Sequence, residues 1–444
     1  MDSTVKISLR PQKRVAPASF SSASVSMLSL QTKIRIDRIV GTPIVHILNL
    51  LSRGLGFFLR RNHDFGDSVK TIVVCKLLGL GGIIQSSPLL KALKDHYPQA
   101  KIIYVTTKAG QGTCEAIPFI DEIILLDDKS PWCLLKSVFS FIRRCHALKV
   151  DAFLNLEVYS QLSNILAITS MGRNRLGYYT KPSDILKVGI YTHMAYYNTF
   201  APRHRIFTQL ALLMDIPESS IEDKLPPLNI NPDAWETACA KLPVLREKNY
   251  VVLASNGSDL SKERRWPTEF FRELVLRLSK CYPDKTFILC GTLNEKTATQ
   301  SIIDGLNNPH IINTAGTFNL AELFNIITYA HIIIANDTGP AHMALALGVK
   351  TLILFGPVHP RQVHMVDQKN FYPIYKSVYC SPCVHIFDTA PCNGNNVCMK
   401  LITVNEVLQA AHLLLNDSEP PQKIPMETLL YGTDGDIFSS IKRS

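Results

Sequence analysis

The stretch IIIANDTGPAHMALALGVKTLILFGPVHP, residues 332–360, decides the fold because it contains two apolar strand patterns and the helical pattern between them. Unbroken apolar runs separated by a helix are typical of a parallel sheet that is covered on both faces. Gly339 opens the helix and Pro340 stands near its first position, where the missing N–H of proline does no harm. The stretch therefore predicts a β–α–β unit whose helix begins where a buried strand ends.

The same alternation extends along most of the chain. Apolar runs such as TIVVC (71–75) alternate with helical patterns, one of them around residues 83–97, and the rhythm resumes near residue 250 after a proline-bearing stretch. We expect an α/β protein with two doubly wound, Rossmann-like domains facing a cleft, where the carboxyl ends of the strands bind ligands. The expected organisation is a disordered basic arm (1–32), an amphipathic helical segment (33–65), a first domain (66–215), a linker (216–248), a second domain (249–415) and a disordered tail (416–444).

The composition limits the partners and the compartment. The 444 residues are 46% hydrophobic and 19% charged, and the formal net charge of +10 favours anionic partners such as nucleotide phosphates or acidic lipids. No RNA-module signature or helix-turn-helix pattern is present, so nucleic acid is not an expected partner. Most of the 11 cysteines stand singly in apolar segments, as is typical of a reducing compartment. We therefore expect a cytoplasmic protein.

The segment KIRIDRIVGTPIVHILNLLSRGLGFFLRR, residues 33–61, is apolar but carries basic residues at both ends. Its charge-free run, residues 39–52, is shorter than the roughly 20 residues of a spanning helix. The first 26 residues of the chain lack the apolar core of a signal peptide. A basic amphipathic helix can lie flat on an anionic membrane, so we expect peripheral membrane contact through residues 33–62. The alternative is a helix packed on the first domain.

The glycine-rich turn LLGLGG, residues 77–82, follows the strand TIVVC and raises the question of a dinucleotide site. Gly79 and Gly81 match the first two glycines of the dinucleotide fingerprint, but Ile84 stands at the third, and no acidic residue ends the next strand. The lysine of a Walker loop is also missing. These patterns argue against a nicotinamide, flavin or P-loop site and leave a tight turn at the mouth of the cleft.

An anion site is predicted instead in the second domain. Asp337 and Thr338 end the strand, Gly339 opens the helix, and His342 lies in its first turn. The free N–H groups and the positive end of the helix dipole at this position suit a diphosphate. An ordinary capped helix is the alternative interpretation.

The motifs D-T-G-P-x-H, A-L-G-V-x-T and F-G-P, in this order, resemble glycosyltransferase family 9, the ADP-heptose:lipopolysaccharide heptosyltransferases, and the resemblance extends over roughly Ile34 to Leu415. It implies the glycosyltransferase-B fold, with the acceptor in the N-terminal half and the donor nucleotide in the C-terminal half. It also implies inverting transfer of heptose from ADP-heptose to an anionic, lipid-linked glycan such as the lipopolysaccharide core. No metal is obligatory for this reaction, and the enzyme would work at the inner face of the cytoplasmic membrane.

The resemblance also assigns donor-binding residues at matching positions. Those that would bind the nucleotide and its phosphates are Asp337, Thr338, Gly339 and His342. The others are Arg264 at the diphosphate, Ser255 and Asn256 as small polar phosphate contacts, and Glu295 as the acid that holds the ribose. A fixed cation beside a leaving diphosphate is chemically reasonable, because negative charge develops there.

One position departs from the family pattern. Gly82 stands where the family usually has an aspartate that serves as general base for the acceptor hydroxyl, and glycine cannot take a proton. Glu157, expected at the carboxyl end of the strand DAFLNLE, is the substitute that we hypothesise. Alternatively Glu157 is satisfied by neighbouring N–H groups or by Arg173 or Arg175. The alternative functions are transfer of another nucleotide-activated sugar, transfer to a protein, or nucleotide-sugar binding without catalysis.

Four cysteines cluster in CSPCVHIFDTAPCNGNNVCMK, with the spacing C-x2-C-x8-C-x5-C, at Cys380, Cys383, Cys392 and Cys398. Four thiolates at this spacing could hold a structural zinc or iron ion, with His385 able to replace one of them. Disulfides in an exported chain, or unligated thiols otherwise, are the alternatives. A metal here would shape the loop beside the donor cleft and take no part in the reaction.

Overall fold

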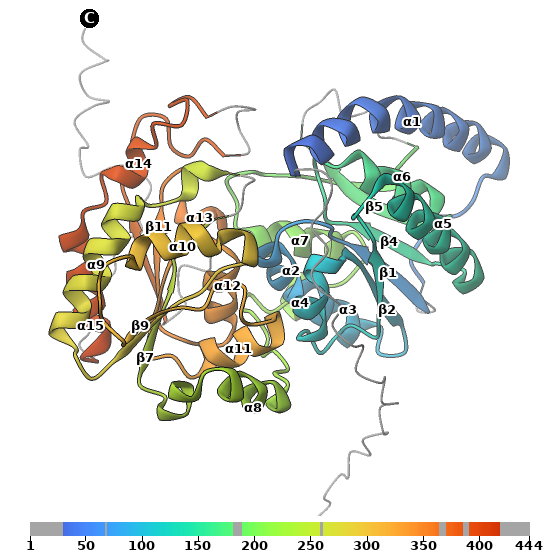
Figure 1. Ribbon diagram of the computed structural model, residues 1–444. Coiled ribbons are helices and arrows are strands. Elements are labelled where there is room, and N and C mark those ends of the chain that lie inside the picture. Colours follow the sequence, from blue (N-terminus) through green and yellow to red (C-terminus); the bar gives the residue numbers. More distant parts are fainter. Residues whose placement is uncertain are drawn as a thin grey trace, which may run out of the picture.

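The computed structural model describes residues 30–66, 69–180, 189–257, 261–363, 370–384 and 390–417. Most of the expected N-terminal arm and C-terminal tail, and His385, lie outside these residues. The described chain forms two six-stranded parallel sheets, each covered by helices (Figure 1). The predicted fold class, two doubly wound α/β domains, is confirmed.

The first domain contains the sheet β3-β2-β1-β4-β5-β6. Its strands are β1 (Thr71–Cys75), β2 (Lys101–Thr107), β3 (Glu122–Leu126), β4 (Ala152–Asn155), β5 (Asn174–Tyr179) and β6 (His193–Tyr196). Its helices are α1 (Leu30–Leu59), α2 (Leu80–Gln85), α3 (Ser87–His96), α4 (Gln111–Glu115), α5 (Pro131–Leu148), α6 (Gln161–Thr169) and α7 (Arg203–Leu212). Val73 of β1 packs in one core with α1, α5 and α6, and Val74 packs in the other with α3 and α7. Alternate residues of the central strand therefore face two helical layers.

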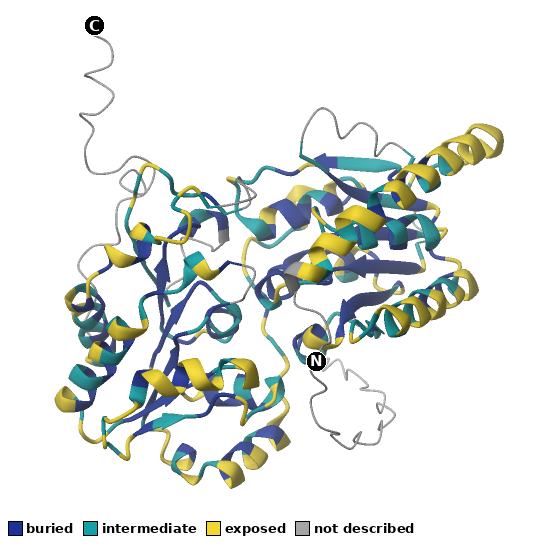
Figure 2. Ribbon diagram, turned by 45° about the horizontal axis from the view of Figure 1, so that its top comes forward, coloured by how far each residue is buried: buried dark blue, intermediate teal, exposed yellow. Residues whose placement is uncertain are grey.

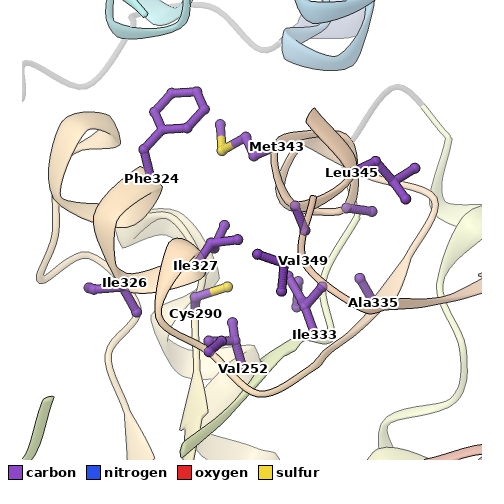
Figure 3. Close-up of a cluster of buried hydrophobic side chains, with 14 of the residues drawn as sticks. Val252, Cys290, Phe324, Ile326, Ile327, Ile333, Ala335, Met343, Leu345 and Val349 are labelled. Atoms are coloured by element: carbon purple, nitrogen blue, oxygen red, sulfur yellow. The ribbon is translucent and has the colours of Figure 1, made fainter. Parts of the chain in front are cut away.

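The second domain repeats this plan with the sheet β12-β11-β10-β7-β8-β9. Its strands are β7 (Tyr250–Ala254), β8 (Thr286–Leu289), β9 (Ile311–Asn313), β10 (Ile333–Asn336), β11 (Thr351–Phe355) and β12 (Phe371–Tyr375). Its helices are α8 (Pro232–Lys241), α9 (Thr268–Cys281), α10 (Lys296–Ile303), α11 (Leu320–Thr328), α12 (Gly339–Ala346), α13 (Pro360–Val363), α14 (Val397–Lys400) and α15 (Val404–Leu415). Figure 3 shows the core on the α11 and α12 side, where Phe324 and Met343 lie above Val252 and Ile333.

Two local differences from the sequence-based expectation have physical causes. The helix expected around residues 83–97 is two helices, because Pro88 has no N–H to donate to the Ile84 carbonyl, and the Ser87 hydroxyl donates to it at 2.7 Å instead. The stretch expected as a linker includes α8, whose Ala238 and Cys239 belong to the core of the second domain.

The two domains touch where α2 meets α12 (Figure 1). Ile84 of α2 and Ala116, just after α4, lie in the same apolar cluster as the α12 residue Met343. The glycine-rich turn of the first domain therefore packs directly on the first turn of α12, at the carboxyl ends of the parallel strands.

Candidate active site

Asp337 is the centre of the polar cluster at the end of β10. Its side chain is 2% exposed and lies between two cationic or protonatable groups. One carboxylate oxygen, Oδ2, is 3.3 Å from Arg264 Nη1, and the other, Oδ1, is 3.3 Å from His342 Nε2. The structure thus brings three of the predicted donor-binding residues into one contact chain.

Asn336, the residue before Asp337, stabilises the surroundings of this cluster by two side-chain hydrogen bonds to the backbone. Its side-chain oxygen accepts from the Trp266 backbone N–H at 3.1 Å, and its Nδ2 donates to the Ser255 carbonyl at 2.7 Å. Trp266 is itself buried, and its indole N–H donates to the Ile402 carbonyl at 2.9 Å. Asn336 therefore connects the ends of β7 and β10 with the segment that carries Arg264. Sequence reasoning missed Asn336, although its place at the end of a buried strand is a signal for such a role.

Arg264 ends a short 3₁₀ turn, η5 (Lys262–Arg264), and points its guanidinium at Asp337. Burial lowers the pKa of Arg264, and the Asp337 carboxylate opposes this by raising it. Arginine stays charged at neutral pH even so. Among the described residues, the buried Nε of Arg264 has no hydrogen-bond partner. The side chain is thus a fixed cation with a spare donor.

The small polar residues after β7 lie at the same edge of the sheet, because β7 and β10 are neighbours. The buried Ser255 hydroxyl has no hydrogen-bond partner in the described part of the chain, whereas Asn256 Nδ2 donates to Thr299 Oγ1 at 2.7 Å. Glu295 accepts from the backbone N–H and the hydroxyl of Thr292, at 2.7 and 2.9 Å, and so caps the turn after β8. A Cβ at Gly291 would lie 3.2 Å from Asn256 Nδ2 and 3.3 Å from Glu295 Oε2, so Asn256 and Glu295 flank the same backbone position.

Thr338 and Gly339 begin α12 with a backbone that faces the first domain. Thr338 is the N-cap residue in extended conformation, and its hydroxyl donates to the Asn336 carbonyl at 3.2 Å instead of capping the helix. A Cβ at Gly339 would lie 3.3 Å from Leu80 of α2. Glycine at 339 therefore permits the close approach of the two domains.

His342 receives a second contact from the first domain. Gln85 Nε2 lies 3.1 Å from His342 Nδ1, and both side chains are buried. When the Gln85 amide donates to Nδ1, the imidazole carries its proton on Nε2, facing Asp337. Gly81 makes this packing possible, because a Cβ there would lie 2.6 Å from His342 Nε2 and 2.7 Å from Cγ.

Glu157 lies beside the glycine-rich turn, at the end of β4. Its Oε1 accepts three hydrogen bonds, each 2.8 Å long, from Lys76 Nζ and from the backbone N–H groups of Leu77 and Leu78. The Lys76 and Glu157 side chains are only 9% and 10% exposed. A Cβ at Gly82 would lie 2.8 Å from Lys76 Cε, so the ion pair borders the position where the family has its aspartate.

The arginines considered as partners of Glu157 point elsewhere. Arg173 Nε donates to the Asn62 carbonyl at 3.0 Å, and Arg175 Nε donates to the Ile190 carbonyl at 2.6 Å. Glu157 is therefore held by Lys76 and two backbone N–H groups, as one of the alternatives in the sequence anticipated, but not by these arginines.

The four clustered cysteines follow β12 and are free thiols, Cys383 and Cys398 being buried. Burial raises the pKa of both thiols to about 11, and the neighbouring thiols of the cluster add to the shift. The described residues contain no group of three or more His, Cys, Asp or Glu side chains placed to hold a metal ion. These thiols thus do not form a coordination sphere as they stand, and the zinc or iron site remains a prediction.

The cysteine loop nevertheless lies next to the donor-side cluster. Asn396 Nδ2 donates to the Arg265 carbonyl at 2.7 Å, and the Cys383 N–H donates to the Pro357 carbonyl at 3.0 Å. The loop therefore supports the segment that carries Arg264.

Two Rossmann-like domains, with a fixed arginine and a helix start where the domains meet, are the architecture of glycosyltransferases with the glycosyltransferase-B fold. The family model of glycosyltransferase family 9 (heptosyltransferase) matches residues 156–393. The chain belongs to this family and is an enzyme of the glycosyltransferase class.

Similar proteins agree with this assignment. The lipopolysaccharide core heptosyltransferase OpsX of Haemophilus influenzae is 22% identical over 300 residues, covering 67% of this chain and 82% of that protein. The structure of a family 9 glycosyltransferase from Veillonella parvula has a TM-score of 0.66 at 21% identity, over 80% of this chain and 100% of that chain. The ADP-heptose heptosyltransferase II of E. coli has a TM-score of 0.63 at 19% identity, over 78% of this chain and 99% of that chain. These structures show a shared fold.

Proposed function

We propose that this protein transfers heptose from ADP-heptose, with inversion, to an anionic lipid-linked glycan of the lipopolysaccharide-core type. The observation that carries the proposal is the chain of contacts Arg264–Asp337–His342 at the start of α12. It offers a fixed cation and a helix start where a leaving diphosphate needs both. The names of similar proteins, which include lipopolysaccharide core and ADP-heptose heptosyltransferases, support the choice of donor and acceptor.

Each donor-side residue has a role in this proposal. Arg264 and the N-terminal turn of α12, with Thr338 and Gly339, would hold the diphosphate, and Asp337 and His342 keep Arg264 and the turn in place. The Ser255 hydroxyl and Asn256 would contact phosphate oxygens, and Glu295 would accept from the ribose hydroxyls. All of these side chains follow neighbouring parallel strands, so one nucleotide can reach them together.

Nucleotide preference tests the proposal. ADP should raise the melting temperature of the purified protein more than UDP or NAD does, since ligand that binds only the folded state stabilises it. Preference for UDP would favour transfer of another nucleotide-activated sugar, and preference for NAD would overturn the glycosyltransferase mechanism proposed for this cleft.

Glu157 is our proposed general base in place of the aspartate absent at Gly82. The donors to its Oε1 fix the orientation of the carboxylate, and in the described part of the chain none of them engages Oε2, which can accept the proton of the acceptor hydroxyl. We expect Glu157→Gln to lower kcat by about 10²–10⁴-fold while ADP affinity is kept. Unchanged turnover in this variant would eliminate Glu157 as the base.

We also propose that the enzyme works at the cytoplasmic face of a membrane, docked through α1. Among the described residues, Thr32–Leu59 is the segment that is long and apolar enough to cross a bilayer by length and composition. The helix packs along α6 of the first domain, and its last residues are exposed. Asp37 accepts from the Gln161 and Leu162 N–H groups at 2.8 and 2.7 Å, and Ser52 Oγ donates to the Gly189 carbonyl at 2.6 Å. Because contacts in both halves of the helix hold it against the domain, they favour an orientation flat on the membrane.

Most of α1 is exposed (Figure 2), and many of its exposed residues are apolar. Nine large apolar residues of this helix are more than half exposed: Ile39, Val40, Ile47, Leu50, Leu51, Leu55, Phe57, Phe58 and Leu59. Helix α5 of the same domain adds three more at Trp132, Leu135 and Phe139. Lys33 of α1 forms an ion pair at 2.7 Å with Asp128, in the segment that precedes α5. Exposed arginines flank the apolar face at 35, 38, 53, 60 and 61. An anionic lipid surface matches this combination of apolar and basic groups.

Replacing one outer residue of α1 tests this docking. Leu50, 69% exposed, should contribute apolar burial in the lipid, so Leu50→Glu should weaken binding to phosphatidylglycerol vesicles about tenfold. Vesicle co-sedimentation measures the effect, with Leu401→Glu in the second domain as the matched control. Equal binding of both variants and the wild type, or equal binding to neutral vesicles, would contradict membrane docking through this face.

A further inference from the structure

Two arginines, one in each domain, stand near the domain junction with part of each guanidinium buried. Arg203 is the first residue of α7 in the first domain, and Arg264 ends η5 in the second. Within the described part of the chain, the buried Nε of each has no hydrogen-bond partner. Buried donors of this kind are costly unless a ligand satisfies them.

Several contacts place Arg203 at the domain junction. Helix α7 touches α13 of the second domain as well as α2, which carries the glycine-rich turn. Within the first domain, burial raises the pKa of Tyr159 to about 12, and the nearby charge of Arg203 opposes this shift. Tyr159 follows β4 two residues after Glu157, so Arg203 stands near the carboxyl end of β4.

The charges of Arg203 and Arg264 act on each other across the junction. Burial lowers the pKa of Arg264, Asp337 raises it, and the charge of Arg203 lowers it further. The described residues provide an ion-pair partner for Arg264, which is Asp337, but none for Arg203. An anion with several oxygens would relieve the repulsion and accept from both guanidinium groups.

We propose that Arg203 and Arg264 form a clamp, one arm from each domain, on the diphosphate of the bound sugar nucleotide. The proposal rests on the proposed function, and it adds the acceptor domain to the groups that bind the donor. A diphosphate is favoured over a phosphate of the acceptor because Arg264 is fixed on Asp337 beside the start of α12. The clamp would neutralise the charge that develops on the leaving group and add a link between the two domains that forms only when the donor is bound.

Calorimetric titration of ADP and of adenosine tests the clamp in the full-length protein. Arg203→Met should weaken ADP binding about tenfold or more, because a charge-assisted hydrogen bond is lost, and should leave adenosine binding unchanged. Arg203→Lys should keep part of the ADP affinity. The matched control is Arg205→Ala on the same helix, since Arg205 is exposed and pairs with Asp223 at 3.0 Å.

The melting temperature, measured with and without ADP, separates a structural role of Arg203 from a role in binding ADP. Without ligand, Arg203→Met should melt no lower than wild type, because a like-charge repulsion has been removed, whereas the melting shift produced by ADP should shrink. ADP affinity within twofold of the Arg205→Ala control, or an equal loss for adenosine, would overturn the clamp. Kept ADP affinity with weaker binding of a phosphorylated glycolipid would also overturn it and assign Arg203 to the acceptor. Failure of the wild type to bind ADP would instead refute the proposed function.

Discussion

Replacement of Arg264 by alanine is expected to lower kcat/KM for the sugar nucleotide about 100-fold or more. The guanidinium is already fixed by Asp337 at 3.3 Å, so its charge needs no reorganisation when the diphosphate departs. Removing one preorganised group that stabilises developing charge typically costs roughly 10²–10³-fold. Without Arg264, the buried Asp337 carboxylate keeps its contact with His342 but loses its contact with a fixed positive charge. Uncompensated buried charge is unfavourable.

Two further variants make this prediction specific. Lys262→Ala removes a positive charge from the same turn, but Lys262 is exposed, so kcat/KM should stay within about threefold of wild type. Arg264→Lys should restore part of the activity, because a lysine supplies the charge without the planar fork. Steady-state kinetics with varied donor concentration measure all three. Equal losses in Arg264→Ala and Lys262→Ala would show that general charge, and not a fixed cation, explains the effect.

Adding a single methyl group at Gly81 should disturb the site from the opposite domain. In Gly81→Ala the new Cβ would lie 2.6 Å from His342 Nε2, and the imidazole cannot retreat easily because it contacts Gln85 and Asp337. The α2 and α12 helices must therefore move apart. Displacement of reacting groups by about 1 Å can cost roughly 10²-fold in rate, so we expect kcat/KM to fall by about that factor.

The matched control for Gly81→Ala is the same substitution at another glycine inside a helix. Gly54 lies in α1 and a Cβ there meets nothing within 4 Å, so Gly54→Ala should leave kcat/KM unchanged and slightly stabilise the helix. The thermal melting curve and kcat/KM of both variants test whether the close packing at Gly81 is needed for activity. Wild-type kinetics for Gly81→Ala would show that the close packing of the two domains is not needed for transfer.

The fold was predictable because its signal is local. Unbroken apolar runs such as TIVVC and TLILF, each followed by a glycine turn or a helical pattern, specify parallel strands buried on both faces. The end of α2 at Gln85 was not predicted from the sequence. Pro88 leaves the Ile84 carbonyl without a backbone donor, and the structure is needed to see that the Ser87 hydroxyl replaces it. Helix α8 was hidden among prolines, and its place became clear only when Ala238 and Cys239 packed against the second sheet.

The candidate site was predictable in part. Asp337, Arg264 and His342 were chosen from motifs, and the structure places them in contact, although their donor-binding roles remain predictions. The contacts of Gly81 and Gln85 with His342 join residues more than 250 positions apart, and periodicity along the chain carries no information on such pairs. Arg203 had no motif to mark it. Its position near the domain junction depends on the packing of α7 against α2 of the first domain and α13 of the second.

The most direct test of the proposed function is transfer from ADP-heptose to a lipopolysaccharide core that lacks heptose, followed by mass spectrometry of the glycolipid. The wild type should add one heptose and release ADP, and Glu157→Gln should bind ADP without adding the sugar. A wild type that binds ADP but adds no heptose, together with a Gly82→Asp variant that does, would contradict the account. That result would mean that the chain binds nucleotide sugars without catalysis, because no other group replaces the aspartate missing at position 82.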